Sequence, residues 1–307
     1  MTSRLLLLPL VLLALVRGAS AAEPVVVIVS SERSPAYQEA ADAALAELAR
    51  GGLPVGDVLQ VTAAELVLQR ATPRLFIALG TEPAAALAGR ETRAPVLCTL
   101  LPRASFERVL RESGRRVSDQ FSALYLNQPH TRQLDLVRLA LPQARRVGVL
   151  WGPDTRQQEA ALEAAAQGRG LKLVGAQIQP HEPVFNGLKR LLDDADLLLA
   201  LADPQIYNSG SIQNILLASF RAKVPMLAFS PAYVRAGALL AVYSTPAQIG
   251  QQAGAIARGV LQGQPLGAPQ YPREFSVSVN EHVARSLGLN LEPQVLTERL
   301  RRQERGS

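Results

Sequence analysis

The chain has 307 residues and very little cysteine or histidine. Its one cysteine, Cys98, excludes an internal disulfide, so stability has to come from packing. Cys98 lies within an apolar run, and we interpret it as a small core residue rather than a nucleophile. The three histidines, His130, His181 and His282, are far apart, and none has metal-ligand spacing to another histidine or to the cysteine. We therefore expect no metal site.

Motifs of nucleotide binding and covalent catalysis are also missing. The sequence has no Gly-x-Ser-x-Gly motif and no Walker loop. The expected first turn between a strand and a helix, residues 30–34, contains no glycine, which close approach of the backbone to a pyrophosphate requires. We expect neither an enzyme nor a cofactor, although a doubly wound enzyme stays as a third hypothesis.

Only one long hydrophobic run is present, residues 5–16, and Arg4 precedes it. A membrane-spanning helix needs roughly 20 apolar residues, so this run suits the core of a signal peptide better than an uncleaved anchor. The small residues 19–21 match a cleavage site, which predicts a signal peptide over residues 1–22. The chain has no second run of this kind and no cysteine near the cleavage site that could be lipidated. We therefore expect no membrane insertion after cleavage, and a location in the periplasm of a two-membrane bacterium.

Basic residues are in excess, with a formal net charge of +6, but they are scattered. A nucleic-acid interface would need a basic stripe with aromatic or helix-in-groove context, and the sequence has none. We expect no nucleic-acid partner. The one cluster is Arg299, Arg301, Arg302 and Arg305, which we interpret as a solvated helix end, with an interaction role as the alternative.

In each half of the sequence, apolar runs alternate with alanine-rich helical stretches, in the same order. The runs occupy residues 25–30, 55–61, 75–80 and 96–99 in the first half and residues 147–151, 171–178, 196–203 and 226–230 in the second. Parallel strands buried on both faces have this continuous apolar character, and their crossover connections are right-handed. The pattern predicts an α/β fold of two Rossmann-like lobes, whose parallel sheets are flanked by helices.

Further elements follow the second set of runs. Residues 239–244 and 274–279 are strand-like, and residues 246–261 have a helical pattern. This late segment allows the chain to return to the first lobe. We predict that residues 23–122 and 245–307 form lobe 1 and that residues 123–244 form lobe 2. Several crossings without glycine-rich linkers predict a hinged cleft that opens and closes.

Six stretches resemble a known family, in the right order along nearly the whole mature chain. They are residues 78–85 (ALGTEPAA), 136–151 (LVRLALPQARRVGVLW), 196–203, 236–239, 250–263 (GQQAGAIARGVLQG) and 279–289 (VNEHVARSLGL). The chain resembles the ABC transporter substrate-binding proteins of the periplasmic-binding-protein type I superfamily, in the branch that binds amino acids. The resemblance implies capture of a small-molecule solute and delivery to the membrane permease of an ABC transporter. We expect a monomer.

Two places depart from the pattern of these relatives. The turn at residues 152–156 differs from theirs, and residues 30–35 stand where the relatives tend to have a His-Pro element. Apart from these departures, Glu82 puts a negative charge where a ligand carboxylate would sit. Glu82 and the altered turn motivate a second hypothesis, an exported accessory or sensory protein with a degenerate bilobed scaffold.

Candidate ligand-binding residues lie where the strands end, because the carboxyl ends of parallel strands form the crevice. They are Ser30, Gly80, Thr81 and Thr99 in the first half and Asp154, Thr155, Asp203, Tyr207, Ser230 and Tyr243 in the second. Gly80 and Thr81 would hold a carboxylate at a helix N-terminus, or Thr81 only caps that helix. Asp203 either meets a ligand amine or makes a structural Asp-Pro turn. Aromatic residues near the strand ends either stack on a ligand or belong to the core.

Overall fold

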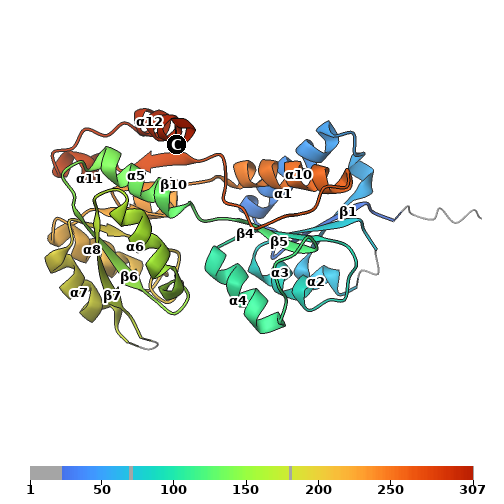
Figure 1. The fold of residues 1–307 in the computed structure, drawn as a ribbon, viewed down its shortest axis with the longest axis horizontal. Coiled ribbons are helices and arrows are strands. Elements are labelled where there is room, and N and C mark those ends of the chain that lie inside the picture. Colours follow the sequence, from blue (N-terminus) through green and yellow to red (C-terminus); the bar gives the residue numbers. More distant parts are fainter. Residues whose placement is uncertain (1–22, 69–71, 180–181, 307) are drawn as a thin grey trace, which may run out of the picture.

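The computed structural model describes residues 23–68, 72–179 and 182–306. It contains two sheets, each flanked by helices and joined by several crossings of the chain (Figure 1). The predicted signal peptide and His181 lie outside the described residues. Among the helices within those ranges, none is long and apolar enough to cross a membrane.

The first sheet has five parallel strands in the order β2-β1-β3-β4-β5. Its elements are β1 (Val26–Ser30), α1 (Pro35–Arg50), η1 (Val55–Asp57), β2 (Val58–Thr62), α2 (Ala63–Leu66), β3 (Leu75–Leu79), α3 (Thr81–Ala88), β4 (Val96–Leu101), α4 (Arg103–Ser113) and β5 (Phe121–Tyr125). Strand β3 is buried throughout, as expected for a continuous apolar run covered on both faces. Cys98 is fully buried in β4, and burial raises the pKa of its thiol, which confirms its interpretation as a core residue.

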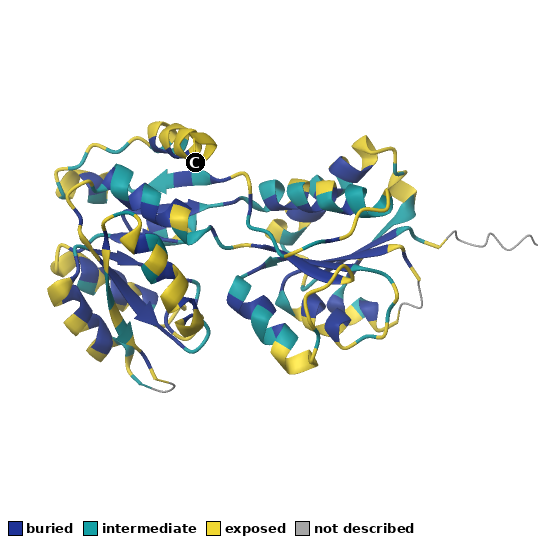
Figure 2. Ribbon diagram, in the orientation of Figure 1, coloured by how far each residue is buried: buried dark blue, intermediate teal, exposed yellow. Residues whose placement is uncertain are grey.

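The second sheet has six strands in the order β11-β10-β9-β8-β6-β7. Its elements are α5 (His130–Ala140), β6 (Arg146–Trp151), η2 (Arg156–Gln158), α6 (Glu159–Gln167), β7 (Lys172–Gln177), α7 (Val184–Asp194), β8 (Leu197–Leu199), α8 (Ile212–Arg221), β9 (Met226–Ala228), α9 (Pro231–Ala236), β10 (Leu240–Tyr243), β11 (Ser276–Val279), α11 (Glu281–Ser286) and α12 (Pro293–Gly306). Buried strands lie inside each lobe and exposed helix faces outside (Figure 2). The predicted fold class is therefore confirmed.

Several strands are shorter than predicted, and β2 and β8 show why. Strand β2 begins at Val58 because a 3-10 turn occupies the three preceding residues. Strand β8 ends at Leu199, four residues before Asp203, because the chain leaves the sheet and the Asp203 amide donates to the Leu201 carbonyl at 2.8 Å.

Helix α10 (Pro246–Leu261) belongs to the first lobe, where it packs on α1. Two buried glycines, Gly250 and Gly254, allow the helices to approach closely. A Cβ added at Gly254 would lie 2.7 Å from the carbonyl oxygen of Ala44, which is backbone and does not move aside.

The prediction that all of residues 245–307 return to the first lobe is wrong. Strand β11 pairs antiparallel with β10, and Leu240 lies opposite Val279. Helix α12 packs on α5 and β11, and Leu296 and Leu300 join the apolar core of the second lobe. The open edge of β10 offers β11 its backbone hydrogen bonds, which explains this placement. At the other end, β5 continues to Tyr125, so the first lobe extends beyond residue 122.

The chain passes between the lobes at three places, which we call the crossing segments: residues 126–129, 244–245 and 271–275. The third follows Gln270, whose backbone amide donates to Ala123 and whose carbonyl accepts from Tyr125, both at 2.8 Å. These bonds hold the segment against β5 before it enters the second lobe. Figure 1 shows the crossing segments running side by side between the lobes.

Candidate functional site

A hollow of about 210 Å³ lies beside the crossing segments, and both lobes contribute to it. Its wall consists of residues 126–128, 229–231 and 242–244, together with Pro102 and Ala202. We call it the interlobe hollow. It lies where strands β5, β9 and β10 end, as expected for a crevice at the carboxyl edge of two parallel sheets.

The wall of the interlobe hollow is mainly apolar and aromatic. Phe229 and Tyr243 contribute rings, and the polar groups are amides and hydroxyls, such as those of Asn127 and Ser230. Phe229 lies edge-on between Tyr207 and Tyr233, with ring centroids 6.0 and 5.0 Å apart. No charged side chain lines the hollow among the described residues. Such a surface accommodates the apolar part of a small molecule.

Asp203 is buried, with 1% of its surface exposed, and organises the turn after β6. Its Oδ2 accepts hydrogen bonds from the Asp154 amide at 3.2 Å and the Thr155 hydroxyl at 3.1 Å, and its Oδ1 accepts from the Gln205 amide at 3.0 Å. Gly152 leaves room for this carboxylate, because a Cβ there would come 2.8 Å from Oδ1. Of the two alternatives for Asp203, these bonds favour a structural role in a turn over contact with a ligand amine.

Asp154 forms an ion pair with the other lobe. Its Oδ2 lies 2.8 Å from Nη1 of Arg108 on α4, and the two side chains are 14% and 35% exposed. Next to this pair, the side-chain amide of Gln157 donates through Nε2 to Oε2 of Glu107 at 2.9 Å. The sequence carried no signal for either contact, since the partners are about 50 residues apart in the chain.

Gly80 links β3 to α3 with φ +106°, a conformation that favours glycine. Its amide donates to the Thr99 carbonyl at 2.8 Å. Because Gly80 occupies the N-cap position and Thr81 is the first helical residue, the alternative that Thr81 caps α3 is wrong. Thr81 and Ser30 are both partly exposed at strand ends of the first lobe.

Two of the predicted site residues carry buried hydroxyls without a hydrogen-bond partner in the described part of the chain. They are Thr99 Oγ1 and the Tyr207 hydroxyl. Burial raises the pKa of Tyr207, and the nearby Asp203 carboxylate adds to this effect. Buried polar groups normally have partners, so both hydroxyls have hydrogen-bonding capacity to spare.

The structure thus places the predicted residues in four different surroundings. Ser230 and Tyr243 line the interlobe hollow, whereas Asp154 and Thr155 lie in the turn after β6, to which Asp203 is hydrogen-bonded. Tyr207 contacts the hollow through Phe229, and the four first-lobe residues lie outside its wall. Sequence reasoning missed residues 126–128, although the expected lobe boundary lay beside them.

The sequence model of one protein family, described as ABC transporter substrate binding protein, matches residues 55–301. The chain belongs to this family. The match includes both sheets except β1, and the interlobe hollow lies within it. The resemblance stated from the sequence is therefore confirmed.

One curated relative of this substrate-binding protein is the tyrosine-binding protein of Clostridioides difficile (strain R20291). The two are 23% identical over 223 residues, which cover 70% of this chain and 63% of the relative. The chain thus spans less than two thirds of the length of that relative.

Solved structures share the fold of this substrate-binding protein. A ligand-free, open substrate-binding protein with adhesive properties from Clostridium difficile has a TM-score of 0.67 at 18% identity, covering 87% of this chain and 95% of that one. An ABC domain in complex with L-Trp from Streptococcus pneumonia has a TM-score of 0.63 at 16% identity, covering 88% and 96%.

Proposed function

We propose that this protein is an exported receptor that captures a small solute between its lobes and delivers it to the permease of an ABC transporter. The observation that carries the proposal is the interlobe hollow, to which both lobes contribute in a chain of the substrate-binding family. A ligand in such a place favours the closed conformation through contacts with both lobes. The apolar run at residues 5–16 and the family support export to the periplasm. We infer a monomer.

The proposed ligand is amino-acid-like or another small organic molecule. The names of the relatives, a tyrosine-binding protein and a complex with L-Trp, support this class. The rings of Phe229 and Tyr243 suit an apolar or aromatic portion of the ligand. Ser230 would contact its polar part, with Ser30, Gly80, Thr81 and Thr99 approaching from the first lobe when the cleft closes.

A second candidate function is an accessory or sensory protein that no longer captures solutes. The observation in its favour is that both candidate carboxylates of the second lobe, Asp154 and Asp203, already have partners within the protein. Asp154 pairs with Arg108, and Asp203 accepts hydrogen bonds from Asp154 and Thr155 in the turn after β6 and from the Gln205 amide. A ligand amine would have to displace one of these partners.

A thermal-shift screen of amino acids, short peptides and small carboxylates tests the proposal, followed by calorimetry of each hit. We expect at least one ligand that raises the melting temperature. Tyr243→Ala should weaken its binding about tenfold or more, because a ring is removed from the hollow. Phe185→Ala is the matched control, since that ring is 58% exposed on α7 outside the hollow. No stabilising ligand across the panel would contradict capture and favour the accessory function.

A further inference from the structure

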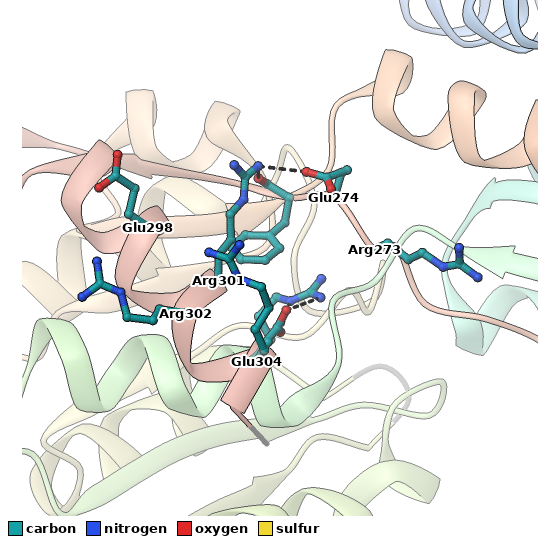
Figure 3. Close-up of a pocket in the computed structure, with 9 residues that line it drawn as sticks. Arg273, Glu274, Glu298, Arg301, Arg302 and Glu304 are labelled. Carbon is teal, nitrogen blue, oxygen red and sulfur yellow. Dashed lines mark hydrogen bonds and ion pairs between the residues drawn. The ribbon is translucent and has the colours of Figure 1, made fainter.

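The C-terminal helix α12 ends beside the crossing segments. A hollow of about 660 Å³ lies between α12, α5 and the third crossing segment, and arginine and glutamate side chains line it (Figure 3). In Figure 3 the side chains of Arg273 and Arg302 point away from one another, so they do not converge on a shared anion. Hydrogen bonds on this surface are made by Arg301, to the Glu274 carboxylate and the Phe275 carbonyl, and by Arg132, whose bonds reach further into the crossing segments.

Arg132 lies on α5 and is 5% exposed, so its charge is buried. Glu304 of α12 pairs with it through both carboxylate oxygens, with Nε–Oε1 at 2.5 Å and Nη2–Oε2 at 2.9 Å. The guanidinium carbon lies 4.2 Å from the ring centroid of Phe275. A bidentate pair that also stacks on a ring fixes the orientation of the guanidinium.

The same guanidinium reaches two crossing segments directly. Its Nη1 donates to Oε1 of Gln128 at 2.7 Å and to the carbonyl of Pro272 at 2.9 Å. Gln128 belongs to the first crossing segment and Pro272 to the third. Arg132 therefore holds these two segments at a fixed separation.

The second crossing segment joins through Ser244. Gln128 Nε2 donates to the Ser244 hydroxyl at 2.9 Å, and this hydroxyl donates to the Glu274 carbonyl at 2.6 Å. One connected group, Glu304–Arg132–Gln128–Ser244 with two backbone carbonyls, thus includes all three crossing segments. We call it the hinge network.

Glu304, on α12, is the one member of the hinge network that lies neither in a crossing segment nor on α5. It is 31% exposed, whereas Arg132 and its other partners are buried or are backbone. Removal of the Glu304 charge would leave a buried cation bonded only to neutral groups of the crossing segments. The segments would then lose the partner that orients Arg132, while Leu296 and Leu300 keep α12 on the second lobe.

We propose that α12 clamps the hinge, and that Arg132 is the positioning residue that transmits its docking to the crossing segments. Lobe motion requires backbone changes in a few segments of this kind. The Arg132–Glu304 pair restricts those changes and determines the range over which the lobes move. This inference concerns the scaffold and holds for any solute, or for none.

The test uses the full mature chain without ligand. Spin labels at Glu112→Cys on α4 and Lys189→Cys on α7 report the distance between the lobes, since both positions are exposed and the native Cys98 is buried. Glu304→Gln should broaden the distance distribution. It should also accelerate amide exchange of residues 126–128, 271 and 273–275 about tenfold, as expected for the loss of a charged hydrogen bond.

Glu298→Gln is the matched control. This glutamate lies on the same helix and lines the same hollow, but no hydrogen bond or ion pair of its side chain is found in the described residues. Arg132→Lys should broaden the distance distribution as Glu304→Gln does, because an ammonium group cannot form the bidentate pair with Glu304. An unchanged distribution in a folded Glu304→Gln protein, or an equal broadening in Glu298→Gln, would overturn the clamp. Because no solute is present, either result is independent of the proposed receptor function.

Discussion

At the scale of single residues, the contacts of Asp154 and Asp203 distinguish a structural role from a role in ligand binding. The sequence predicts Asp203 at the crevice because it follows an apolar run, and Asp203 does lie shortly after the end of β8. Its buried carboxylate nevertheless accepts from the turn that carries Asp154 and Thr155. A local pattern predicts position, whereas the partner of a buried group depends on residues far along the chain.

Asp203→Asn should lower the free energy of unfolding by about 1–3 kcal/mol, because an amide NH₂ would face hydrogen-bond donors in a buried turn. Urea denaturation measures this change. Asp119→Asn is the control, since that aspartate is exposed in a loop and its side chain has no bond in the described residues. Equal stability of both variants would contradict the structural role of Asp203.

At the scale of elements, periodicity identified most helices and strands because their apolar faces are local features of the sequence. The helix predicted over residues 246–261 matches α10. The antiparallel return of β11 to β10 was missed, because strand partners are decided by which sheet edge is open in the folded chain. The sequence predicted only the general position of the interlobe hollow, at the strand ends. It did not predict the contribution of a crossing segment to the wall.

Gly254→Ala should destabilise the first lobe although alanine is the better helix former. The added Cβ would collide with the Ala44 carbonyl in α1, and overpacking of this kind costs about 1–3 kcal/mol. Thermal unfolding provides the measurement. Gly259→Ala on the same helix is the control, because its new methyl would meet only the end of the flexible Gln264 side chain. A melting temperature that rises equally in both variants would be incompatible with close α1–α10 packing.

At the scale of the whole molecule, the lobes touch away from the hinge as well as through it. The Arg108–Asp154 pair and the Gln157–Glu107 hydrogen bond connect α4 with the turn after β6. Partly exposed pairs contribute at most about 1 kcal/mol, so this contact affects the balance between open and closed forms more than stability. The sequence predicted a hinged pair of lobes but no bond between them.

Arg108→Ala should increase the radius of gyration of the ligand-free protein measured by small-angle X-ray scattering, with little change in melting temperature. The reason is the loss of a bond that opposes separation of the lobes. Arg111→Ala is the control, an exposed arginine on the same helix without an ion pair in the described residues. High salt should reproduce the effect in the unmodified protein. An unchanged radius in Arg108→Ala would refute the restraint.

The packing of α10 on α1 also bears on how the protein is made. The face of α1 that carries Ala40 and Ala44 is covered by helix α10, which follows five of the six strands of the second sheet in the chain. During synthesis the nascent first lobe therefore has an incomplete core until residue 261 has left the ribosome. For the export proposed above, this order of synthesis means that translocation machinery, which threads unfolded polypeptides, would meet the chain before it can become compact.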